Sequence, residues 1–166
     1  RRRSQLLNHR PDLSVSDIRG NVDTRLKKLD DGQFDAIILA EAGLVRLQLA
    51  DRIKQVLAKE IMLPALEQET RGLECRETDS LRSLDDAQTH AAVIAERTLL
   101  ATLRGGCLAP IGAWARVIKS EFTLAAAVLS GDGSQRLAHE GAGELNDSEA
   151  LCPAGAVHFL VVGAGE

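Results

Sequence analysis

The feature that most constrains the fold is a long helical pattern at residues 84–106, LDDAQTHAAVIAERTLLATLRGG. Its apolar residues recur on one face of a helix, at positions Ala92, Ala95, Leu99 and Leu103. Gly105 and Gly106 predict where the helix ends, because glycine readily adopts the backbone conformation that follows a helix C-terminus. A helix with one apolar face needs a partner surface that buries this face.

The residues after this helix predict that partner surface. Three segments with the composition of strands follow, at 111–118, 122–130 and 136–141. The turn sequence SGDGS at 130–134 joins the last two. We therefore expect a three-stranded antiparallel sheet packed on the long helix, which is a small α+β unit.

The first 63 residues have a different pattern, in which short apolar runs alternate with helical segments. Residues 13–18 and 34–40 predict two strands. Between them, NVDTRLKKLDDG at 21–32 predicts a helix with Asn21 as its N-cap, and residues 41–57 predict a further helix. Strand, helix and strand at this spacing predict a βαβ unit and hence a parallel α/β sheet.

These patterns predict two domains joined by a connecting segment. Residues 1–63 are expected to form a partial α/β anion-binding domain, and residues 84–166 a C-terminal α+β domain; residues 64–83 connect them. The tail at 142–166 is ambiguous, because Pro153 breaks a helix whereas VHFLVV favours a strand.

Composition narrows the class of protein. Apolar residues make up 45% and charged residues 27%, which is ordinary for a globular protein. No apolar run approaches the roughly 18 residues of a membrane-spanning helix, so we expect a cytoplasmic protein without a membrane partner. Three cysteines without a CxxC pair indicate neither a disulfide framework nor a metal site. The net charge of −4 predicts no general attraction to nucleic acid.

One cysteine, Cys107, stands in the glycine-rich segment LRGGCLAPIGAWA at 103–115. The neighbouring glycines predict an exposed loop, which is a setting for a reacting or modified thiol. Arg104 would then stabilise the thiolate. The alternative is a small apolar residue at a tight turn. No histidine of the chain stands in a motif that would make it a partner of this thiol: His9, His90, His139 and His158.

A second candidate site is the segment DIRGNVDTRL at 17–26, with Arg19 and Arg25 on either side of a Gly-Asn turn. Both side chains and the N–H groups of the helix start could converge on one anion, and Gly20 would let that anion approach the backbone. Arginine suits this role because its fork binds a carboxylate with two hydrogen bonds. The alternative is two unrelated surface arginines. Three further arginines could join the same cleft: Arg1, Arg2 and Arg46.

Two long blocks resemble the porphobilinogen deaminase (hydroxymethylbilane synthase) family: RRRSQLLNHRPDLSVSDIRGNVDTRLKKLDDGQFDAIILAEAGLVRL and AERTLLATLRGGCLAPIGAWA. The resemblance implies a transferase that deaminates porphobilinogen and joins four units into hydroxymethylbilane, in tetrapyrrole biosynthesis. It also implies a monomer whose partners are porphobilinogen and polypyrrole intermediates. For residues 1–63 it implies part of a parallel α/β domain like those of periplasmic binding proteins.

The resemblance also assigns roles to individual residues. It implies that Cys107 carries a dipyrromethane cofactor through a thioether. The positions that match the family's arginines for the acetate and propionate groups of the cofactor are Arg1, Arg2, Arg19, Arg25 and Arg46. Of these, Arg19, Arg25 and Arg46 would also bind substrate.

The chain departs from the family pattern in two respects. The family's catalytic aspartate lies in a domain outside this sequence, so we expect no catalytic residue here and no activity of the chain alone. The family's VGQG segment is LEQE at 66–69, where Gln68 is kept and Glu67 and Glu69 replace glycines. We expect two carboxylates there to repel an anionic substrate.

Two other functions remain open from the residues. A non-catalytic carboxylate-binding module of the periplasmic-binding-protein type would explain the arginines but gives no reason for the GGC loop. A thiol-reactive regulatory domain would rest on Cys107 alone.

Overall fold

The computed structural model describes residues 1–68, 70–76, 81–104, 106, 109–119 and 121–144. The chain forms two compact units, one of Arg1–Leu13 with Lys59–Glu166 and the other of Ser14–Ala58. This division differs from the expected domain at residues 1–63, because the first thirteen residues group with the C-terminal part of the chain.

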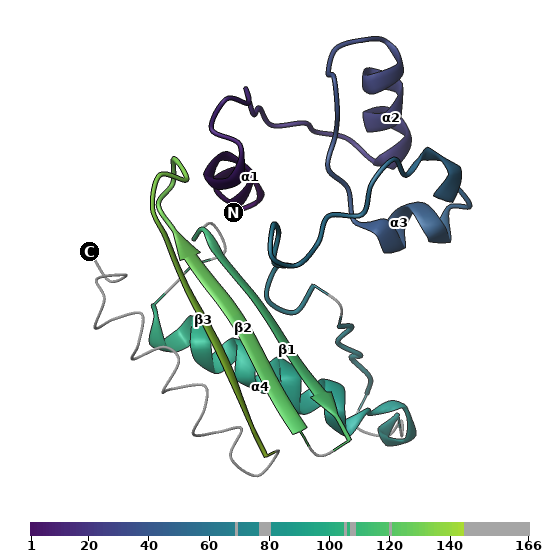
Figure 1. Cartoon of the computed structure of the whole chain (residues 1–166). Coiled ribbons are helices and arrows are strands. Elements are labelled where there is room, and N and C mark those ends of the chain that lie inside the picture. Colours follow the sequence, from purple (N-terminus) through teal and green to yellow (C-terminus); the bar gives the residue numbers. More distant parts are fainter. Residues whose placement is uncertain (69, 77–80, 105, 107–108, 120, 145–166) are drawn as a thin grey trace. The chain divides into compact units, whose positions relative to one another are not determined.

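The larger unit contains the antiparallel sheet that the sequence predicts. Its strands are β1 (Ile111–Ile118), β2 (Glu121–Leu129) and β3 (Arg136–Glu144), hydrogen-bonded in the order β1-β2-β3 (Figure 1). Their register places Trp114 opposite Ala125, and Ala125 opposite Glu140. The meander is therefore confirmed.

The turn between β2 and β3 is held by one carboxylate. Asp132 accepts hydrogen bonds from the hydroxyl of Ser130 and from the backbone N–H and hydroxyl of Ser134. These bonds lower the pKa of Asp132 to about 2. Gly133 has φ +80°, and a Cβ there would lie 2.5 Å from the carbonyl oxygen of Ser4. Only glycine fits at this position of the turn.

The predicted long helix is α4 (Ala87–Thr102), which lies along one face of the sheet (Figure 1). The carboxylate of Asp86 caps its start by accepting from the N–H of Thr89 at 2.7 Å. The helix starts later than expected, because residues Arg82–Leu84 form a short 3-10 helix, η2. At its other end Arg104, ahead of the two glycines, takes the left-handed conformation with φ +51°.

The apolar face of α4 packs as predicted. Leu99 is fully buried, and so is Phe122 on β2. One cluster joins the helix to the sheet, and its buried members are Ala95, Leu99, Ala113, Ala115, Phe122, Leu124 and Ala126. The predicted helix residues Ala92 and Leu103 pack against it.

A helix that the sequence analysis did not predict, α1 (Arg2–His9), docks on the larger unit. The side-chain amide of Gln5 makes two hydrogen bonds to the backbone of Leu63, donating to the carbonyl at 3.1 Å and accepting from the N–H at 2.8 Å. Ser4 and Asn8 donate to the carbonyls of Gly131 and Gly133 in the β2–β3 turn. Polar residues on one face of a short helix normally indicate a solvated face, so this docking has no signal in the sequence.

The smaller unit contains α2 (Val22–Asp30), α3 (Glu41–Arg46) and a 3-10 helix, η1 (Ala50–Arg52). Helix α2 is the predicted one, and Asn21 caps it by accepting from the N–H of Thr24 at 2.8 Å. The helix expected at 41–57 is much shorter, since Gln48 takes the left-handed conformation with φ +60°.

The parallel sheet expected in this unit is not formed. Neither 13–18 nor 34–40 belongs to a β-strand in the described structure. A parallel strand is stable when it has strand neighbours and when helices cover its faces. The apolar residues 37–39 are only half-buried in this unit, so they lack the environment that such a strand requires.

Within the part of the chain that the structure describes, every helix is too short or too polar to cross a membrane.

Candidate anion-binding and cofactor site

The start of α2 gathers basic side chains around one turn of the backbone. The Nε of Arg25 donates to the carbonyl of Gly20 at 2.8 Å, so the side chain folds back over the turn. Nζ of Lys28 donates to the carbonyl of Arg19 at 3.1 Å. The side chains of Arg25 and Lys28 therefore both contact the backbone of this turn, and Lys28 is a residue that sequence reasoning missed. The convergence of the Arg19 and Arg25 side chains on one anion stays a prediction.

The backbone of this turn requires glycine. Gly20 has φ +120°, and a Cβ there would lie 2.8 Å from a side-chain carbon of Thr24. Asn21 then begins the helix, where the partial positive charge of the N-terminus adds to that of the basic side chains. A carboxylate is the ligand that this combination of donors suits.

The other predicted arginines lie in two places. Arg46 is exposed in the last turn of α3, within the smaller unit. Arg1 and Arg2 are adjacent at the start of α1, within the larger unit. Burial lowers the pKa of Arg1, and the charge of Arg2 lowers it further. The convergence of all five arginines on one cleft stays a prediction.

Cys107 lies outside the described residues, as do Gly105, Cys152 and His158. The exposed thiol of Cys75 lies within them. Among the described residues, no group of three or more His, Cys, Asp or Glu side chains is arranged to hold a metal ion.

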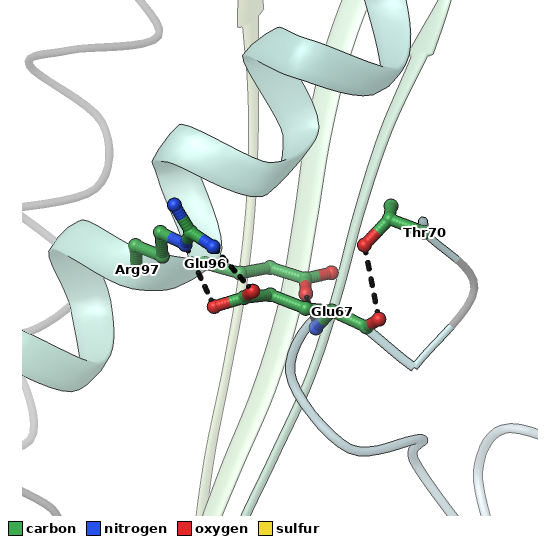
Figure 2. A network of polar contacts seen from close by, with 4 residues as sticks. All are labelled: Glu67, Thr70, Glu96 and Arg97. Carbon is green, nitrogen blue, oxygen red and sulfur yellow. Dashed lines mark hydrogen bonds and ion pairs between the residues drawn. The ribbon is translucent and has the colours of Figure 1, made fainter. Parts of the chain in front are cut away.

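The structure corrects our expectation for Glu67, whose carboxylate does not stand alone. Arg97 donates to it from Nε at 2.9 Å and from Nη2 at 2.8 Å (Figure 2). These hydrogen bonds lower the pKa of Glu67. The guanidinium of Arg97 offsets the negative charge of Glu67, which our expectation of repulsion did not take into account. Glu69 lies outside the described residues.

The sheet face away from α4 carries a further group of basic residues. Nζ of Lys59 and the guanidinium carbon of Arg116 lie 4.0 Å and 3.8 Å from the ring centroid of Trp114. Both cations are within the range of a cation–π interaction. They border an open depression of about 410 Å³ on this face. Sequence reasoning missed this group, because Lys59 lies far along the chain from Trp114 and Arg116 of β1.

The fold defines a class of protein: one with an α+β C-terminal part and a separate, smaller unit that carries a basic turn. Comparison with known families is more specific. The family model "Porphobilinogen deaminase, dipyromethane cofactor binding domain" matches residues 1–83, and "Porphobilinogen deaminase, C-terminal domain" matches residues 90–156. The chain belongs to the porphobilinogen deaminase family.

Curated relatives agree with this assignment. Porphobilinogen deaminase of Desulforudis audaxviator is 46% identical over 171 residues, which cover 100% of this chain and 55% of the relative. The Brevibacillus brevis protein of that name is 46% identical over 172 residues, with the same two coverages. The Chlorobaculum tepidum one is 47% identical over 145 residues, 84% of this chain and 46% of the relative. The chain thus spans about half the length of these relatives.

Proposed function

We propose that this chain supplies the anion-binding and cofactor-holding part of a hydroxymethylbilane synthase, the transferase that deaminates porphobilinogen and joins four units into hydroxymethylbilane. The observation that carries the proposal is the pair of family matches, in order, over residues 1–83 and 90–156. The partners we propose are porphobilinogen and polypyrrole intermediates, bound by a cytoplasmic monomer. We also propose that residues 64–83 connect its two functional domains.

The donor set suits the chemistry of these ligands. Each porphobilinogen carries two carboxylates, so a chain of six pyrrole rings accumulates about a dozen negative charges that need guanidinium partners. In this proposal the carboxylates bind at the turn that holds Arg19, Arg25 and Lys28, whose geometry supports the assignment. Arg1, Arg2 and Arg46 bind the remaining acetate and propionate groups.

Cys107 is the proposed point of attachment for the dipyrromethane. When bound, this group supplies the covalent anchor on which the chain of pyrrole units grows. A thioether suits an anchor that must survive each cycle, because its carbon–sulfur bond is not the bond that releases the product. The sulfur of Cys107 therefore acts as a permanent attachment point.

The attachment is tested by the intact mass of the chain isolated from a porphobilinogen-producing host. We expect an added mass of the size of a dipyrromethane, and we expect Cys107→Ser to remove it completely. Cys75→Ser is the matched control, because Cys75 is an exposed thiol of the same chain and should keep the adduct. The absence of an adduct, or an adduct that survives Cys107→Ser, contradicts the assignment.

The arginine turn is tested by titrating the chain with porphobilinogen. Arg19→Leu and Arg25→Leu should each weaken binding about tenfold, since each removes a charge-assisted hydrogen bond worth about 1.5 kcal/mol. Lys54→Leu is the control, because it removes an exposed positive charge from the same unit. If both arginine variants bind like the control, these residues do not belong to the site.

A further inference from the structure

The turn at residues 66–68 contains a strained residue. Glu67 has φ +60°, the left-handed region in which a side chain with a Cβ crowds the backbone. Such a conformation persists only where the surrounding structure holds it in place. Three groups of Glu67 make hydrogen bonds that can hold it: the backbone N–H, the backbone carbonyl and the side-chain carboxylate.

Two of these groups contact α4. The N–H of Glu67 donates to Oε2 of Glu96 at 2.6 Å, and its carboxylate accepts both donors of Arg97 (Figure 2). The carbonyl of Glu67 accepts from the hydroxyl of Thr70 at 3.0 Å. Two consecutive residues of α4 thus bind Glu67: the carboxylate of Glu96 binds its backbone N–H, and the guanidinium of Arg97 binds its carboxylate.

The same segment is attached to two other elements of the larger unit. The backbone of Leu63 is held by Gln5 of α1, and the carbonyl of Pro64 accepts from the N–H of Ala113 on β1 at 3.3 Å. Residues 63–67 therefore contact α1, β1 and α4 in turn. We call these five residues the bracket.

We propose that the bracket holds α1 in position against α4. Arg1 and Arg2 lie at the start of α1, and α4 is the helix that precedes Cys107. The ion pair between Glu67 and Arg97, which we call the latch, attaches the bracket to α4. Arg97 is thus a positioning residue that stabilises a glutamate at a backbone position suited to glycine. That this positioning of α1 and α4 matters for cofactor binding rests on the proposed function. The latch itself does not, because its contacts involve neither cofactor nor substrate.

The latch is tested by thermal unfolding of the whole chain. Arg97→Gln should lower the melting temperature by about 2 °C, a modest shift because this guanidinium is largely exposed and screened by solvent. Adding Glu67→Gly to Arg97→Gln should restore it, since glycine adopts φ +60° without help. Adding Glu67→Gln should not restore it, because glutamine keeps the strain. Arg71→Gln, an exposed arginine near the turn, is the control and should leave the melting temperature unchanged.

The positioning role is tested by amide hydrogen exchange in the same variants. Arg97→Gln should speed exchange in α1 at least threefold, and the added Glu67→Gly should reverse this change. A melting temperature unaffected by Arg97→Gln, or equal rescue by glycine and glutamine at position 67, overturns the latch. Unchanged exchange in α1 overturns the bracket. Neither measurement uses a ligand, so failure here is distinct from failure of the proposed function.

Discussion

Replacing Phe122 with alanine is expected to lower the free energy of unfolding by about 4 kcal/mol. Phe122 is a fully buried side chain of β2, and it belongs to the cluster that joins the sheet to α4. Its neighbours across the strands are Val117 and Gly143, neither of which can fill the space that a lost ring leaves. Urea denaturation with an unchanged slope would measure this loss directly.

Ile118→Ala is the matched control for Phe122→Ala. Ile118 is a large apolar residue of β1, but it is 54% exposed, so its truncation should cost less than about 1 kcal/mol. A loss from Phe122→Ala as small as that from Ile118→Ala would contradict the core described above.

Glu96→Ala is expected to cost about 3 kcal/mol of unfolding free energy. Glu96 is 7% exposed, and its carboxylate accepts from two backbone N–H groups, that of Ala115 at 2.8 Å and that of Glu67 at 2.6 Å. Alanine leaves both donors without this acceptor, and a buried donor that loses its partner keeps the full cost of desolvation. Glu96→Gln should cost less, because one amide oxygen remains to accept.

Two measurements check the role of Glu96. Urea denaturation gives the loss of stability, and amide exchange at Ala115 and Glu67 reports the two hydrogen bonds one by one. Gln88→Ala, at an exposed position of the same helix, should change neither. Protection of the Ala115 amide that is unaffected by Glu96→Ala would show that this carboxylate does not hold β1.

Stability and the proposed anion binding depend on different parts of this chain. Core packing between α4 and the sheet provides the stability of the larger unit. Polar contacts of Glu96 and Arg97 attach the bracket to that core, and those of Gln5 attach it to α1. The basic turn at the start of α2 lies in the other unit. Substitutions in the core should therefore affect stability, whereas substitutions in the turn should affect anion binding.

The predictions that succeeded depend on local signals. The apolar face of α4 and the alternation of the three strands recur within a few residues, and the SGDGS turn specifies how β2 and β3 meet. Asn21 caps α2 through a bond to a residue three positions on. The contact between the Arg25 side chain and the carbonyl of Gly20 is local in the same way, since only five positions separate the two residues.

By itself the sequence determined the helix-and-meander unit, helix α2 with its Asn21 cap, and the family. Only the tertiary structure decided that residues 13–18 and 34–40 form no strands, that α1 docks through Gln5 on a backbone 58 positions away, and that Glu67 pairs with an arginine 30 positions away. Helix periods, caps and turns act between neighbours in the chain, so they are visible in the sequence. Strand pairing and long-range polar contacts form only when distant segments meet, and the geometry of that meeting depends on the whole packed chain.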